Sequence, residues 1–317
     1  MTQPVAWVLS NGLIGMDNQS IGLAEALGVD YTVKRIVPAA PWKHLPPALW
    51  WKPLRNLSAD SDLLCPPWPD VVIGTGRMSV AASIAIRRAS GGKTKNIRIQ
   101  HPRVGFRHFD IIVASHHDHC QGENVIEALG AVNRMSARRM ADEAQRFLPR
   151  LQHLSHPWVT VLLGGNNSQY QLDGAFAKRL AAHLSRALHE SGGSALITPS
   201  RRTDAAFIRV LQDDLQGLPT EFWSGEGENP YFAWMGLADR IVVTADSVNM
   251  ASEASFTGKP VFVAGLTGKN NKFERFHRSL QEYGSTRPFT GELPLWQYTP
   301  LDETRRVAEL IKQKWGW

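Results

Sequence analysis

The stretch Asp239–Gly265, DRIVVTADSVNMASEASFTGKPVFVAG, decides the fold. Its β-branched run Ile241–Thr244 is long enough for a buried strand, and Asp246 then offers oxygens that accept the unpaired amides of a first helical turn. Small and apolar residues follow at helical spacing, Gly258 fits a helix end, and Pro260–Val263 begins a further strand. The stretch therefore predicts strand, helix and strand, with polar residues at the carboxyl end of the first strand.

The same alternation continues on both sides of this stretch. Apolar runs in the first half predict strands at residues 5–9, 31–36, 70–73, 97–100 and 111–113. In the second half, further strands are predicted at residues 159–163, 195–198 and 221–223. Strands that alternate with helices indicate an α/β protein with parallel sheets.

The length of 317 residues exceeds what one hydrophobic core usually serves, so we expect two Rossmann-like lobes with an interdomain cleft. A charged helical stretch ends near residue 150 without further apolar periodicity, which places the expected lobes at residues 1–150 and 151–300. Residues 301–317 contain an amphipathic helix, which we expect to return to the first lobe.

Composition excludes several classes of protein. Hydrophobic residues make up 43% and charged residues 20%, as in a globular protein, and no apolar run approaches the ~18–20 residues of a membrane span. Two cysteines, Cys65 and Cys120, cannot build a disulfide framework. Val5–Leu9 is too short an apolar run for a signal peptide. We therefore expect a cytoplasmic protein.

A net charge of +6 and an isoelectric point near 9.4 favour anionic partners such as phosphates, nucleotides or acidic lipid surfaces. The same charge is equally consistent with solubility alone. Because the sequence has no basic run of five residues and no zinc-finger or RNA-binding motif, nucleic acid is not an expected partner.

Two turns in the second half carry groups suited to phosphate. Gly164, Gly165 and Asn166 directly follow a predicted strand, where backbone amides can approach an anion. Ser200, Arg201 and Arg202 lie at the end of the next strand, and two guanidiniums there would form a clamp for a phosphate. The alternatives are a tight turn without a ligand and a solvated arginine.

The opening stretch adds hydroxyl and carboxylate groups at a third strand end. Asp246, Ser247 and Ser252 are polar, and the Glu253 carboxylate can accept hydrogen bonds from both hydroxyls of a ribose. The alternative for Asp246 and Ser247 is helix capping alone. Three strand ends with phosphate donors and a ribose acceptor describe a nucleotide site more specifically than any one motif.

These residues belong to a set of motifs that resembles a known family. The set is SNGLIGMDNQSIGLAEALG, PDVVIGTGRMSVAASIAIRR, IQHPR, SHHDH, LLGGNN, TPSRRT, GENPYFAWMGLAD, TADSVNMASEA and KFERFH. The two-lobed order resembles GT-B glycosyltransferases, and the full set resembles the mitochondrial fission ELM (elongated mitochondria) family. The resemblance implies a GT-B fold and transfer of a sugar from a nucleotide-sugar to an acceptor glycan or lipid, with no obligatory cofactor or metal.

The resemblance also implies a role for each matching position. The donor site would contain Gly164, Gly165, Asn166, Ser200, Arg201, Asn229, Asp246, Ser247, Ser252 and Glu253. The acceptor side would contain Asn18, Gln19, Arg77, Gln100 and His101. The catalytic candidates are Asp17, His117 and Asp118: Asp17 or a histidine of the 116–119 loop would act as general base. The alternative for Asp17 is an ordinary cap of the following helix.

The run His116–Cys120 (HHDHC) invites a metal-site interpretation. Adjacent residues in one loop rarely point at one ion, and the sequence has no second pair at metal-ligand spacing. We therefore predict no metal there.

The segment Pro41–Leu57 (PWKHLPPALWWKPLRNL) mixes tryptophan and leucine with lysine and arginine. This composition is typical of a patch at a membrane surface, although a proline-rich loop packed on the first lobe fits it equally well. An exposed patch would place the protein peripherally on the inner face of the membrane, with an anionic surface and an envelope-associated, lipid-linked acceptor as partners.

Two other functions fit the same pattern. A nucleotide-sugar epimerase of the same architecture would need no acceptor, and a non-enzymatic interaction protein would keep the two lobes with a vestigial cleft. A NAD-dependent oxidoreductase is disfavoured, because the glycine fingerprint is missing after the first strand.

Overall fold

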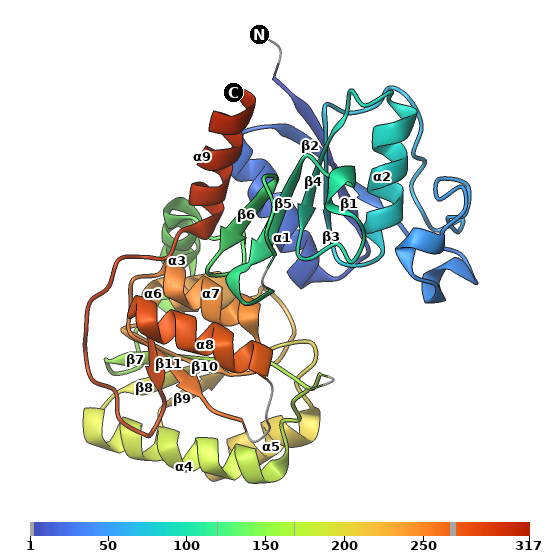
Figure 1. Cartoon of the computed structure of the whole chain (residues 1–317). Coiled ribbons are helices and arrows are strands. Elements are labelled where there is room, and N and C mark those ends of the chain that lie inside the picture. The colour runs from blue at the N-terminus through green and yellow to red at the C-terminus, as the bar shows by residue number, and fades with distance from the viewer. Residues whose placement is uncertain (1–2, 119, 168, 267–270) are drawn as a thin grey trace. The chain divides into compact units, whose positions relative to one another are not determined.

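The computed structural model describes residues 3–118, 120–167, 169–266 and 271–317, apart from the side chains of His117 and Asn271. These residues form two compact units, each with a parallel six-stranded sheet covered by helices (Figure 1). Unit 1 comprises Met1–Arg134 and Asp302–Trp317, and unit 2 comprises Met135–Leu301. The prediction of an α/β protein with two parallel sheets is confirmed.

The sheet of unit 1 has the strand order β2-β1-β3-β4-β5-β6, and every neighbouring pair is parallel. Its strands are β1 (Val5–Ser10), β2 (Asp30–Arg35), β3 (Val71–Thr75), β4 (Lys95–Ile99), β5 (Ile111–Ser115) and β6 (Val125–Ala128). The chain leaves β1 toward β2 and then crosses back to place β3 on the other side of β1. The strand order therefore reverses between β1 and β3, which is where open α/β sheets form a ligand crevice.

Helices cover both faces of this sheet. On one face, α1 (Ile14–Leu27) and α9 (Glu303–Trp315) pack on inward-facing β-branched residues of β3, β4 and β5. On the other face lies α2 (Ser79–Ala89), whose Ala82 and Ile86 pack with Trp7 and Val72. The described residues of unit 1 also form short 3₁₀ helices: η1 (Trp42–His44), η2 (Pro47–Leu49), η3 (Phe106–His108) and η4 (His116–Asp118).

The C-terminal helix α9 belongs to unit 1 although it follows unit 2 in the chain. Its buried Val307 and Ile311 join the core beneath α1. At its start, Glu303 accepts a hydrogen bond from the amide of Leu129 at 2.8 Å, and the hydroxyl of Thr304 accepts one from the amide of Asn133 at 2.8 Å. These contacts attach the returning chain to the end of the first segment of unit 1.

The sheet of unit 2 has the order β12-β11-β10-β7-β8-β9, again with all neighbours parallel. Its strands are β7 (Trp158–Leu163), β8 (Ser194–Pro199), β9 (Thr220–Phe222), β10 (Arg240–Thr244), β11 (Val261–Ala264) and β12 (Thr286–Pro288). The chain runs from β7 outward to β9 and returns to β10 on the other side of β7. The strand order therefore reverses between β7 and β10.

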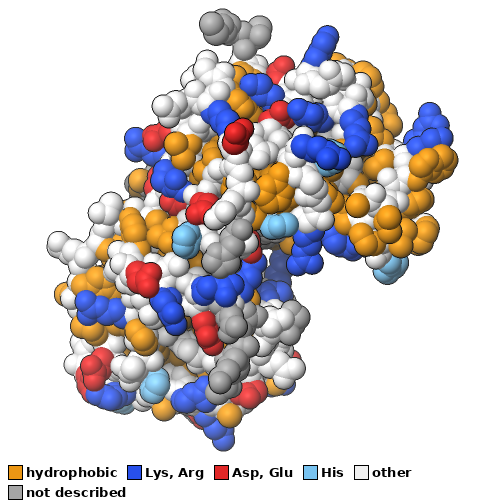
Figure 2. All heavy atoms as spheres, in the orientation of Figure 1, with side chains coloured by type: hydrophobic (Ala, Val, Ile, Leu, Met, Phe, Trp, Pro, Cys, Tyr) orange, Lys and Arg blue, Asp and Glu red, His pale blue; other side chains and the backbone are white. Residues whose placement is uncertain are grey.

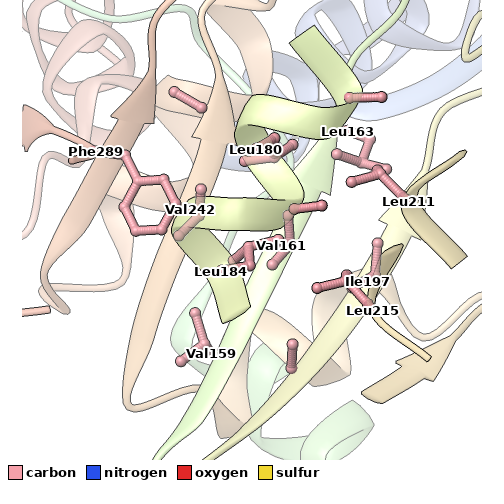
Figure 3. Close-up of a cluster of buried hydrophobic side chains, with 14 of the residues drawn as sticks. Val159, Val161, Leu163, Leu180, Leu184, Ile197, Leu211, Leu215, Val242 and Phe289 are labelled. Atoms are coloured by element: carbon pink, nitrogen blue, oxygen red, sulfur yellow. The ribbon is translucent and has the colours of Figure 1, made fainter. Parts of the chain in front are cut away.

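The largest core of unit 2 lies between its sheet and the helices α4 (Gly174–Ser191) and α5 (Ala205–Asp214). Figure 3 shows α4 in front of the central strands, with its Leu180 and Leu184 in the same cluster as Val161 and Val242. The opposite face is covered by α3 (Ala137–Leu151) and α6 (Tyr231–Leu237), and Figure 1 shows α7 (Val248–Phe256) and α8 (Asn271–Tyr283) on that side too.

The division between the units falls after Arg134, not near residue 150 as the sequence suggested. The reason is helix α3, which was assigned to the first lobe. Its Phe147 and Leu151 are buried against Trp158 of β7 and Trp234 of α6. The helix therefore starts unit 2 instead of ending unit 1.

Candidate functional site

The carboxyl ends of three adjacent strands of unit 2 meet where its strand order reverses. The turn Gly164–Asn167 follows β7, Ser200–Thr203 follows β8, and Asp246–Ser247 follows β10. The polar stretches that the sequence singled out separately thus lie at one sheet edge.

Asp246 joins two of these turns. Its side chain is fully buried, and its Oδ2 accepts a hydrogen bond from the amide of Gly165 at 2.8 Å. Its Oδ1 accepts one from the Thr244 hydroxyl at 2.6 Å, and that hydroxyl in turn accepts one from the amide of Gly164 at 2.8 Å. Burial raises the pKa of Asp246, while these hydrogen bonds and the charge of Arg202 oppose the rise.

This arrangement corrects the expected role of the two glycines. Their amides were predicted to hold a phosphate, but the Gly164 amide donates to Thr244 at the end of β10 and the Gly165 amide donates to Asp246 in the turn that follows. A Cβ on Gly164 would lie 2.2 Å from Asp246, and one on Gly165 would lie 2.3 Å from the backbone of Arg202. Glycine is therefore required here for close packing of the turns.

Of the two arginines that the sequence places after β8, the one beside Asp246 is Arg202, whereas the family resemblance carried only Arg201 into the donor site. Its Nη2 lies 3.6 Å from Asp246 and its Nη1 donates to the Gly165 carbonyl at 3.3 Å, while about half of its side chain (49%) is exposed. Arg201, the predicted phosphate ligand, is exposed and makes no hydrogen bond or ion pair with any residue that the structure describes. Ser200 fixes the turn by donating to the Gly164 carbonyl at 2.8 Å.

Helix α7 begins directly after Asp246. Ser247 caps it, since its Oγ accepts a hydrogen bond from the amide of Met250 at 3.3 Å. The positive end of the helix dipole thus lies next to the turn that carries Arg202, and the combination suits an anion. The Oδ1 of Asn166 accepts a hydrogen bond from the amide of Leu172 at 2.8 Å, so the oxygen side of this amide is used within unit 2.

Glu253, on the second turn of α7, holds the start of α6. Its Oε2 accepts a hydrogen bond from the Tyr231 hydroxyl at 2.5 Å, and Asn229 accepts one from the amide of Tyr231 at 3.0 Å. Burial raises the pKa of Glu253 to about 7, partly offset by the Tyr231 hydrogen bond. The side chain of Ser252 donates to the Val248 carbonyl at 2.8 Å, within the helix. Glu253 thus already has one intramolecular partner at the position expected to receive a ribose.

In unit 1, the reversal point between β1 and β3 holds a hydrogen-bonded pair. The Ser10 hydroxyl, at the end of β1, donates to Asp17 Oδ2 at 2.8 Å and accepts a hydrogen bond from the amide of Gly12 at 3.0 Å. Burial raises the pKa of Asp17, and the Ser10 hydrogen bond opposes the rise. Asp17 does not cap α1: the cap position is Leu13, whose carbonyl accepts the amides of Met16 and Asp17.

The predicted acceptor-side residues fall into three groups. Gln19 is buried and accepts a long hydrogen bond from Gln100 at 3.4 Å, so those two lie together, and Asn18 is half-buried beside Gln19 on α1. His101 is exposed, and its Nδ1 accepts the amide of Arg103 at 2.9 Å. Arg77 turns away to the 41–57 loop, where its Nη1 donates to the Leu45 carbonyl at 2.8 Å.

Only part of the 116–119 loop, which carries the predicted catalytic His117 and Asp118, lies among the described residues. Asp118 lies half-buried in η4, whereas the side chain of His117 and all of His119 lie outside the described residues. The neighbouring His116 is paired with Glu127 at 3.2 Å. In the part of the chain that the structure describes, no group of three or more His, Cys, Asp or Glu side chains is arranged to hold a metal ion.

Comparison with known proteins identifies the family. The model of the protein family described as "Mitochondrial fission ELM1" matches residues 14–315 of this chain. The chain belongs to the mitochondrial fission ELM1 family. It is 30% identical over 279 residues to Mitochondrial fission protein ELM1 of Arabidopsis thaliana, a match that covers 78% of this chain and 65% of the plant protein. An uncharacterized protein of Rickettsia prowazekii is 25% identical over 350 residues, with 96% of this chain and 97% of that protein covered.

Solved structures show which fold this ELM1-family chain has. The UDP-GlcNAc 2-epimerase of Methanocaldococcus jannaschii matches with a TM-score of 0.59 at 10% identity, covering 98% of this chain and 100% of the other. The same enzyme in complex with UDP-GlcNAc and UDP matches with a TM-score of 0.55 at 10% identity, with the same coverage. MurG of Acinetobacter baumannii matches with a TM-score of 0.51 at 15% identity, covering 98% and 99%. The ELM1-family chain therefore has the GT-B type of fold, as its motifs implied.

Proposed function

We propose that this ELM1-family protein is a GT-B glycosyltransferase, which moves a sugar from a nucleotide-sugar to an envelope-associated acceptor, a glycan or a lipid-linked sugar. The observation that carries the proposal is the meeting of Arg202 and the start of α7 at the reversal point of the unit 2 sheet. An exposed guanidinium beside a helix N-terminus provides two sources of positive charge for a diphosphate.

In this proposal, unit 2 stabilises the departing nucleoside diphosphate. Charge builds up on the diphosphate as the bond to the sugar breaks, and donors already fixed in place stabilise it without reorganisation. Asp246 fixes them: its hydrogen bonds hold the β7 and β10 turns together, and its charge attracts Arg202. Ser247 caps α7 and so stabilises the first turn of the helix that follows Asp246.

The proposed general base is Asp17 of unit 1. Its partial burial raises its pKa toward the range in which a carboxylate accepts a proton, and the Ser10 hydroxyl orients it through a 2.8 Å hydrogen bond. An acceptor hydroxyl that lies within hydrogen-bond reach of Asp17 would lose its proton as it attacks the sugar. Gln19 and Gln100, which lie together, would contact the acceptor.

The second candidate is an epimerase that acts on the nucleotide-sugar alone. UDP-GlcNAc 2-epimerase structures match nearly the whole of both chains, and the donor site described above would serve either reaction. The two differ in their need for an acceptor. The third candidate, a protein that acts only through interactions, is favoured by the name of the plant relative, of which this chain covers 65%.

Product analysis separates the three. The full chain is incubated with radiolabelled UDP-, GDP-, CMP- or dTDP-sugars, with and without a bacterial envelope lipid extract, and the products are resolved by chromatography. Transfer predicts a labelled lipid or glycan that forms only with the extract, and Asp17→Asn should abolish it. Glu25→Gln, an acidic residue of α1 that pairs with Arg134, is the control and should transfer normally. An altered sugar without extract supports the epimerase, and no product under any condition contradicts both enzymes.

The proposed acceptor also suggests where the protein acts. No helix among the described residues is long and apolar enough to cross a membrane. We propose that transfer takes place on the cytoplasmic side, at the inner face of the membrane, where a nucleotide-sugar and a lipid-linked acceptor would meet.

A further inference from the structure

The segment 41–57 presents an apolar tip at the surface of unit 1. The tip consists of Leu49 and Trp51, whose side chains are 62% and 64% exposed. Between them, Trp50 turns inward: it is buried, and its Nε1 donates to the Leu45 carbonyl at 3.1 Å. The loop thus exposes Leu49 and Trp51, while the buried Trp50 anchors it.

The loop behind the tip is fixed to the body of unit 1. Arg77, at the start of α2, donates to the carbonyls of Leu45 and Lys43. Leu54 and Leu57 pack on the cluster that contains Ile86 of α2. Because these contacts hold the backbone, the exposure of the tip is a property of the folded loop, and the loop backbone needs little further ordering when the tip meets a partner.

Positively charged residues flank the tip in the sequence, and one of them contacts it. The segment 41–57 contains Lys43, Lys52 and Arg55 and no acidic residue, and the Lys52 ammonium lies 4.1 Å from the centre of the Trp51 ring. Figure 2 shows hydrophobic side chains gathered beside Lys and Arg at the part of unit 1 that Figure 1 draws in blue next to α2.

The charge of the whole chain is concentrated in the same unit. Of the 35 lysines and arginines, 18 lie in unit 1, whereas only 13 of the 29 acidic residues do. Unit 1 therefore carries +5 and unit 2 carries +1 of the total of +6. An anionic partner is attracted to unit 1 more strongly than to unit 2.

We infer that this tip docks on an anionic phospholipid bilayer, with Leu49 and Trp51 inserted at the headgroup boundary and Lys43, Lys52 and Arg55 facing the lipid phosphates. Two apolar side chains bury far less than the ~800 Å² per partner of a stable protein interface, which argues against a second copy or another protein as the occupant. A bilayer accepts a few apolar side chains and adds roughly 1 kcal/mol for each nearby cation. The inference needs no sugar transfer, so it stands apart from the proposed function.

Vesicle sedimentation tests the apolar part. The full chain is mixed with phosphatidylcholine vesicles that contain about 30% phosphatidylglycerol, and the bound fraction is measured against lipid concentration. Leu49→Ser/Trp51→Ser should lower the partition coefficient by about tenfold or more, since two large apolar side chains no longer enter the boundary. The matched control is Leu148→Ser/Leu295→Ser, two exposed leucines of unit 2 (42% and 70%), which should bind as the wild type does.

The cations are tested on the same vesicles. Lys52→Gln and Lys43→Gln should each weaken binding about fivefold, and pure phosphatidylcholine or high salt should weaken it further. A second readout places the tip in the membrane: a polarity-sensitive dye on Leu49→Cys, in a Cys65→Ser background, should shift to the blue with anionic vesicles, whereas the dye on Leu295→Cys should not.

Three outcomes would overturn the inference. They are equal binding by the tip variant and the wild type, an unshifted dye at position 49, and loss of a dimer, seen by light scattering, when the tip is changed. The last result would assign the tip to a second copy of the chain.

Discussion

The Asp246 carboxylate accepts a hydrogen bond from the amide of Gly165 at 2.8 Å, although 81 residues separate them in the sequence. This bond joins the turn after β10 to the turn after β7 at the point where the sheet of unit 2 reverses its order. The geometry of the proposed donor site therefore depends on one buried carboxylate.

Replacing that carboxylate should destabilise unit 2. Asp246→Ala leaves the Gly165 amide and the Thr244 hydroxyl without their acceptor in a buried place, and we expect the free energy of unfolding to fall by about 2–4 kcal/mol. Urea denaturation followed by circular dichroism measures the change. Asp173→Ala, which removes only the cap of α4, should cost about 1 kcal/mol. If the free energy of unfolding fell equally in the two variants, Asp246 would contribute no more to stability than a helix cap does.

The two glycines of the β7 turn should resist substitution. In Gly165→Ala the new Cβ would lie 2.3 Å from the backbone of Arg202, so the β8 turn must move and take the guanidinium with it. We expect a lower melting temperature and at least tenfold weaker nucleotide binding. Gly174→Ala, at the start of α4, meets no atom within 4 Å and serves as the control. Unchanged nucleotide binding by Gly165→Ala would show that this turn is not part of the nucleotide site.

The two neighbouring arginines should behave differently. Arg202→Ala removes the guanidinium 3.6 Å from Asp246, and we expect at least tenfold weaker binding of a nucleoside diphosphate because a charge-assisted contact is lost. Arg201→Ala should change binding less than twofold, since that side chain is exposed and has no partner among the described residues. Fluorescence titration with a labelled nucleotide compares them. The reverse ranking would restore Arg201 as the phosphate ligand.

Glu253 should make stability depend on pH. Because its pKa is about 7 in the folded protein and about 4.5 when exposed, the folded state binds its proton more tightly than the unfolded chain does. Its contribution to stability is present below pH 4.5 and is lost as the pH rises to about 7, by up to about 3 kcal/mol. Glu253→Gln keeps an acceptor for Tyr231 and should flatten this part of the curve. Parallel curves for the two proteins, from denaturant titrations at pH 4.5 to 8, would refute the assignment.

Local chemistry in the sequence predicted much of the fold. The β-branched run before Asp246 forms β10, and Ser247 caps the helix that follows, because both features depend on residues close together in the chain. The alternative that Asp17 caps the following helix would have started α1 at about Asn18, but α1 begins at Ile14. No side chain caps it, so the usual sequence signal for a helix start was absent.

Contacts between distant residues could not be read in the same way. Whether Arg201 or Arg202 reaches Asp246 depends on how the Ser200–Thr203 turn folds, and adjacent arginines give no signal that separates them. The Tyr231 partner of Glu253 lies on another helix, so the sequence showed a carboxylate but not its hydrogen bond. Likewise, no periodicity in segment 41–57 indicated that Trp50 is buried and Trp51 exposed.

The most direct test of the proposed donor site is isothermal titration of the full chain with nucleoside diphosphates and nucleotide-sugars, in buffer that contains a metal chelator. We predict saturable binding at one site per chain, weakened at least tenfold by Arg202→Ala and less than twofold by Arg201→Ala. Absence of binding by every nucleotide, or equal affinity in the two variants, would contradict it.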